Sequence, residues 1–151
     1  MKKFFQLTAF IFLFIACNNS GNNNKTGKTK ADSLMEEVME GHNAGMAKMS
    51  RIEDAQGKIV KSIDSISKLP ASIQKTSARY KLQLDSILDR LKHANYVMGK
   101  WMNEFNMDSD LNNMQKRIEY LESEKNKVTK VKDVMVSSLQ KADSLLNKKI
   151  K

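Results

Sequence analysis

Apolar side chains recur at alternating steps of three and four residues from Met35 to Leu146, and this spacing constrains the fold most. Heptad spacing predicts amphipathic helices that pack side by side. It divides into three seams, which run from Met35 to Ile66, from Ile73 to Phe105 and from Leu111 to Leu146. The chain is therefore expected to be all-α.

The two breaks between the seams have causes in the sequence. Pro70 is the only proline, and it suits the first turn of a helix but not its interior. Near the second break, Asp108, Ser109 and Asp110 offer side chains that can cap a helix start. We therefore predict helices over about 31–68, 70–106 and 109–149.

Connections this short make neighbouring helices antiparallel. The expected fold is an elongated antiparallel three-helix bundle, with the C-terminal Lys148, Lys149 and Lys151 at the far end from the N-terminus. The alternative is a long coiled coil that associates with copies of itself, since uninterrupted heptads permit both.

The N-terminus predicts export and lipid attachment. Lys2 and Lys3 precede an apolar run over residues 4–16, which is too short to span a bilayer, and Cys17, the only cysteine, follows at once. Residues 1–16 are thus interpreted as a cleaved lipoprotein signal peptide and Cys17 as the acylated residue. Residues 17–30, rich in Asn, Gly, Lys and Thr, are predicted to form a flexible, disordered tether before a helical domain over 31–151.

The chain is basic, with a formal net charge of +9. Removal of Lys2 and Lys3 with the signal peptide leaves +7. An exported, membrane-anchored protein rarely meets nucleic acid, so we expect the charge to lie on solvated helix faces, with the membrane lipid and an envelope component as partners.

Methionine and histidine gather in one half of the predicted rod. If the first two helices fold back near residue 69, His42 lies level with residues 96–98, and a second turn near residue 107 sets Met98 level with Lys116. Met135 then falls in the other half.

Thioether and imidazole groups together suit a soft metal such as Cu(I). The candidate ligands are His42, Met46 and Met98. The residues expected around them are Met39, Met49, His93, Met102 and Met114. The competing interpretation gives no cofactor: methionine fills an irregular core, Gly41 and Gly45 make room for Trp101, and His42 is a core residue. A His and Met pair could also ligate haem, although no C-x-x-C-H motif for covalent haem occurs.

Catalytic motifs are missing from the sequence. It has no P-loop, G-x-G-x-x-G, H-E-x-x-H or G-x-S-x-G, and its two histidines are not accompanied by a converging set of acids or nucleophiles. We therefore expect a protein that is not an enzyme.

Four stretches carry a resemblance: VMEGHNAGMAKM from Val38, KWMNEFNMDSD from Lys100, RIEYLESEK from Arg117 and SLQKADSLL from Ser138. They resemble a group of small Bacteroidota lipoproteins that often carry the label "viral A-type inclusion protein". The resemblance implies export and a helical domain of unknown role, and it transfers no binding residue. Surface-exposed lipoproteins of that phylum tend to carry acidic residues just after the cysteine, whereas this tether has none before Asp32. An outer-membrane location facing the periplasm is therefore favoured.

The sequence thus predicts a lipid-anchored envelope protein with a structural or protein-interaction role. The alternative is a periplasmic copper-binding module. A third hypothesis is that the terminal Lys151 is joined to the cell wall.

Overall fold

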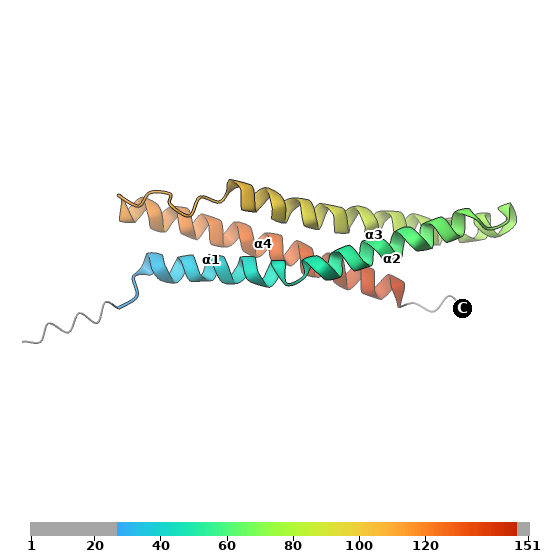
Figure 1. Ribbon diagram of the computed structural model, residues 1–151, viewed down its shortest axis with the longest axis horizontal. Coiled ribbons are helices and arrows are strands. Elements are labelled where there is room, and N and C mark those ends of the chain that lie inside the picture. The colour runs from blue at the N-terminus through green and yellow to red at the C-terminus, as the bar shows by residue number, and fades with distance from the viewer. Residues whose placement is uncertain (1–26, 148–151) are drawn as a thin grey trace, which may run out of the picture.

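The computed structural model describes residues 27–147, which form a long helical rod (Figure 1). The all-α prediction is confirmed, and no strand occurs between residues 27 and 147. The helices are α1 (Lys30–Met46), α2 (Met49–Ser67), α3 (Ala71–Glu104) and α4 (Met114–Leu146). α1 and α2 together make the first leg of the bundle, α3 the second and α4 the third. The predicted signal peptide, Cys17, most of the predicted tether, Lys148, Lys149 and Lys151 lie outside the described residues.

The prediction of a single helix over 31–68 is wrong. The chain forms two helices there, which are separated by Ala47 and Lys48. The Lys48 N–H donates to the Gly45 carbonyl at 2.8 Å, which is the tighter i to i−3 pattern that ends α1. α1 packs mainly against α4, whereas α2 packs mainly against α3. The break therefore redirects the first leg from one neighbour to the other (Figure 1).

The turn at Pro70 agrees with the prediction. α2 ends at Ser67 and α3 begins at Ala71, with Pro70 directly before the first helical residue. The Gln74 side-chain amide donates to the carbonyls of Ser67 (3.0 Å) and Leu69 (2.8 Å), which closes the turn.

The second connection is longer than expected. α3 ends at Glu104 and α4 begins only at Met114, so the predicted start at residue 109 is wrong. Asn113 is the residue that caps α4, because its side chain accepts from the Lys116 N–H at 3.1 Å. The Arg117 guanidinium donates to the carbonyls of Met107 (3.1 Å) and Ser109 (2.9 Å) and so fixes the connection to α4.

The longer connection changes the register between α3 and α4. Trp101 Nε1 donates to Glu124 at 2.9 Å, and Phe105 stacks on Tyr120 with ring centroids 6.2 Å apart. Met98 therefore lies at nearly the same position along the rod as Val128. The prediction that it lies at the position of Lys116 is wrong. At the end of the rod where α3 ends, α4 begins beyond Glu104. At the opposite end, α4 stops short of the first turns of α3.

The core is one continuous apolar layer along the rod. Its fully buried large side chains are Val38, Ile52, Ile59, Leu84, Leu91, Met98, Leu121, Val128 and Met135. α1 and α4 run parallel, and ion pairs join Lys30 to Glu122 (2.6 Å) and Lys125 to Glu37 across them. No helix within residues 27–147 is long and apolar enough to cross a membrane.

Candidate interaction surface

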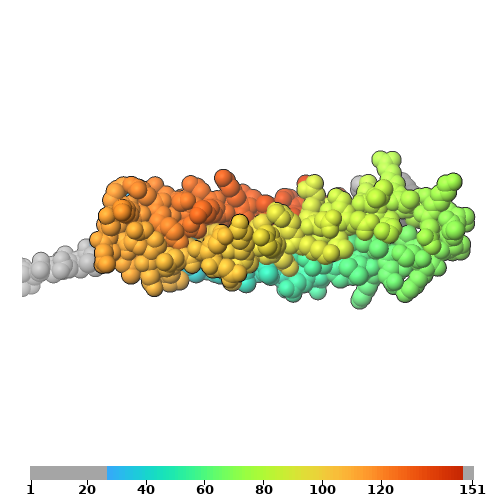
Figure 2. Space-filling model, turned by 90° about the horizontal axis from the view of Figure 1, so that it is seen from above, coloured from blue at the N-terminus to red at the C-terminus, as the bar shows by residue number. Residues whose placement is uncertain are grey.

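The α2–α3 hairpin continues beyond the C-terminal end of α4 (Figure 1). The last turns of α4 lie against residues 79–87 of α3, so that Leu145 shares a cleft with Arg79 and Gln83. Residues 71–78 of α3 extend past this point, which is about 12 Å at 1.5 Å per residue. We call residues 60–82 the hairpin overhang. They form the end of the rod that is green in Figure 2.

The apolar seams continue into the overhang, but they become exposed near its tip. In α3, Leu84 and Leu91 are fully buried, whereas Ile73 in the same seam is 47% exposed. In α2, Ile66 is 9% exposed and Leu69, at the turn, is 40% exposed. The difference follows from α4, which covers the seam at Leu84 and not at Ile73. Within residues 27–147, the overhang is therefore a two-helix hairpin whose exposed apolar residues are not covered by a third helix.

The overhang is also basic. Residues 60–82 carry five cations and one carboxylate, a formal net charge of +4. Asp64 pairs with Lys68 at 2.6 Å, and Lys81 pairs with Asp85 at 2.9 Å. Lys75 and Arg79, by contrast, make no ion pair with any other described residue.

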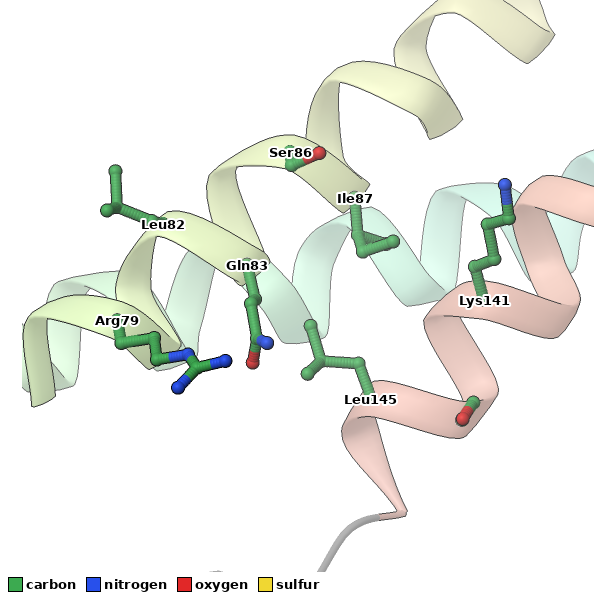
Figure 3. Close-up of a pocket in the computed structure, with 8 residues that line it drawn as sticks. Arg79, Leu82, Gln83, Ser86, Ile87, Lys141 and Leu145 are labelled. Atoms are coloured by element: carbon green, nitrogen blue, oxygen red, sulfur yellow. The ribbon is translucent and has the colours of Figure 1, made fainter.

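A cleft of about 440 Å³ lies where α4 ends against α3. Arg79 and Gln83 lie on the same side of α3, next to Leu145 of α4 (Figure 3). Lys141 supplies a second cation, and Ile87 supplies part of the apolar wall. Two cations beside apolar side chains, with no carboxylate in the lining, suit an anionic and partly apolar ligand.

The overhang was not predicted from the sequence. Two features together could have indicated it: the seam of α3 starts at Ile73, and the connection before α4 is long. Only when the connection extends to Asn113 does α4 shift along the rod and leave Ile73 uncovered.

The proposed copper ligands are placed in different surroundings. Met98 is fully buried, and Met46 is 36% exposed at the end of α1. The His42 ring lies 5.7 Å from the Trp101 ring, and its Nδ1 is 3.1 Å from the Asn43 side-chain oxygen. His42 thus lies at the same position along the rod as Trp101. The prediction that it lies at the position of residues 96–98 is wrong.

The surrounding methionines and His93 are also divided. Met39 and Met49 are half-buried, whereas His93, Met102 and Met114 are exposed. His93 lies beside Tyr96, with ring centroids 6.5 Å apart. Within residues 27–147, no three His, Cys, Asp or Glu side chains are placed to hold a metal ion. The Cu(I) site at His42, Met46 and Met98, which relies on methionine ligands, stays a prediction.

The two glycines of α1 allow close packing, although not around Trp101 as expected. A Cβ on Gly41 would lie 2.8 Å from Val128 Cγ1 of α4. A Cβ on Gly45 would overlap Met98 Cε and lie 3.3 Å from Met135 Sδ. The expectation that Met135 lies in the other half of the rod is therefore wrong, because it meets Met98 beside Gly45.

A buried carboxylate lies next to the tryptophan. Glu124 is 3% exposed and accepts from Trp101 Nε1 and from Lys127 Nζ at 2.7 Å. The hydrogen bond to Glu124 raises the pKa of Lys127 above its ordinary value. Trp101 also stacks on Phe105, with ring centroids 5.0 Å apart. These contacts satisfy the buried Glu124 carboxylate and the Trp101 N–H, and they fix the register of α3 against α4.

No protein-family model, curated protein or solved structure matches this chain.

Proposed function

We propose that this chain is a lipid-anchored helical protein of the cell envelope that binds another envelope component through the hairpin overhang. Residues 1–17 support the anchor, because a basic start, an apolar run and a single cysteine are typical of an exported lipoprotein. Absence of acidic residues before Asp32 favours the periplasmic face of the outer membrane.

The geometry of the rod supports an interaction role. The described chain enters α1 at one end of the rod, and the overhang lies at the other end (Figure 1). A tether at Cys17 would leave the overhang free to reach away from the membrane. The single observation that carries the proposal is the exposure of Ile73 at 47%, whereas Leu84 and Leu91, farther along the same seam, are fully buried.

Site-specific photo-crosslinking in intact cells tests this function. A photoreactive residue in place of Ile73 should give a discrete adduct with an envelope protein. The same residue in place of Thr129, an exposed polar position of α4, is the matched control and should give none. Equal patterns from both positions, or none from Ile73, would contradict an interaction role for the overhang. Loss of membrane attachment in Cys17→Ser checks the anchor separately.

Copper binding is the second candidate function. Convergence of the Met98 and Met135 side chains on Gly45 favours it, because it brings two soft thioethers close together. The hypothesis is that His42, Met46 and Met98 bind Cu(I). A copper titration of the protein under reducing conditions should then show stoichiometric uptake, and no uptake would dispose of this function.

A further inference from the structure

We infer that the hairpin overhang binds an acidic amphipathic helix of a partner protein, which lies in line with α4 and completes the three-helix bundle. This inference rests on the proposed interaction role and adds the chemistry of the partner.

The shape of the site favours a helix. α4 packs against both α3 and α2 and ends at Leu146. Past that residue, Ile73 and Leu69 of the hairpin are partly exposed. A helix in this position would present apolar side chains at steps of three and four to the same seams that α4 covers elsewhere. Residues 71–78 correspond to about two helical turns.

The charge of the site argues against a second copy of this chain. Pairing two overhangs would bring together two surfaces of formal charge +4. Like charges at close range oppose such an association, whereas a partner rich in Asp and Glu would be attracted.

Particular cations define where the partner's carboxylates would lie. Arg79 borders the cleft beside Leu145, and Lys141 lies on the α4 side of the same cleft. Neither forms an ion pair with another described residue. An Arg guanidinium can bind a carboxylate through two parallel hydrogen bonds, so Arg79 is the expected main contact. Ile73 and Leu69 would receive the apolar face.

A binding assay with defined peptides tests this inference. The full chain, purified from its host and held in nanodiscs of neutral lipid, is titrated into a fluorescent synthetic helix of about three heptads. The acidic peptide carries Leu at the a and d heptad positions and Glu at the others. The basic control peptide carries Lys in place of Glu. We expect the acidic peptide to bind at least about tenfold more tightly, with an affinity that falls as salt is raised.

Variants then locate the site. Arg79→Glu and Ile73→Asp should each weaken binding of the acidic peptide at least about tenfold. Lys116→Glu is the matched control, because it reverses an exposed charge on α4 at the opposite end of the rod, and it should leave binding unchanged.

The failures can be told apart. Equal binding of both peptides, with a persistent adduct from Ile73 in cells, would overturn the acidic partner and keep the interaction role. Binding unaffected by Ile73→Asp would place the site elsewhere and overturn the inference. Binding to anionic vesicles that requires Arg79, with no binding to either peptide, would replace the helix with a membrane surface.

Discussion

Replacing Gly41 with alanine tests how closely α1 packs against α4. The new Cβ would lie 2.8 Å from Val128 Cγ1, 3.6 Å from Cγ2 and 3.8 Å from Cβ. Val128 is fully buried, and a β-branched side chain in a helix is held near one rotamer, so it cannot swing away. The methyl group therefore has to move the helices apart or strain Val128.

Two opposing effects set the magnitude. Overpacking of a full core costs about 1–3 kcal/mol. Alanine is favoured over glycine inside a helix by about 1 kcal/mol. Gly57→Ala is the matched control, because it lies within α2 and nothing lies within 4 Å of its added Cβ. The propensity gain is common to both variants, so Gly41→Ala should be less stable than Gly57→Ala by about 1–3 kcal/mol.

Urea denaturation followed by circular dichroism measures this difference in the free energy of unfolding. A double variant of Gly41→Ala with Val128→Ala should show favourable coupling, because removal of the Val128 methyl groups makes room for the new one. Equal stabilisation by Gly41→Ala and Gly57→Ala would refute the close contact between α1 and α4.

Three further predictions concern other parts of the rod. Trp101→Phe should lower the free energy of unfolding by about 1–3 kcal/mol in urea denaturation, since it removes a donor from the buried Glu124 carboxylate. Thr29→Ala should lower the melting temperature at neutral pH, because the Thr29 hydroxyl caps α1 and its hydrogen bonds lower the pKa of Asp32 below 3.8. Stability from a lowered carboxyl pKa is present above the unfolded-state value and is lost as pH falls through the folded-state value. The difference between the two melting temperatures should therefore narrow below about pH 3.8, and the part that comes from the Thr29 cap on the Asp32 N–H should remain. Ile73→Asp should change the stability of the isolated protein by less than about 0.5 kcal/mol, because Ile73 is 47% exposed, and a larger loss would show that its side chain is covered.

The three legs of the bundle and the turn at Pro70 follow from local sequence. Heptad spacing fixes which face of each helix is buried, and proline fixes where α3 can begin. These features need no knowledge of the rest of the chain, and the structure agrees with them.

The break at Ala47 and Lys48 depends on tertiary packing instead. Both residues favour helix, so local propensity predicts continuation. The chain breaks where the first leg leaves α4 for α3, and Gly45, whose carbonyl accepts from the Lys48 N–H, weakens the helix there without fixing the break by itself.

The start of α4 was ambiguous because several residues near it can cap a helix. Asn113 is used, since Arg117 holds the carbonyls of Met107 and Ser109 outside the helix. This choice moves α4 along α3, and it determines both the level of Met98 and the exposure of Ile73. The error in the predicted level of Met98 against α4 and the failure to foresee the overhang thus have one cause.

Amide hydrogen exchange along α3 tests most directly whether the overhang lacks a third helix. Beyond its first turn, amides of residues 75–78 should exchange at least about tenfold faster than those of residues 84–101, because α4 covers only the latter. Uniform protection along α3 in the isolated protein would show that the overhang is already covered and would contradict its role as a docking surface.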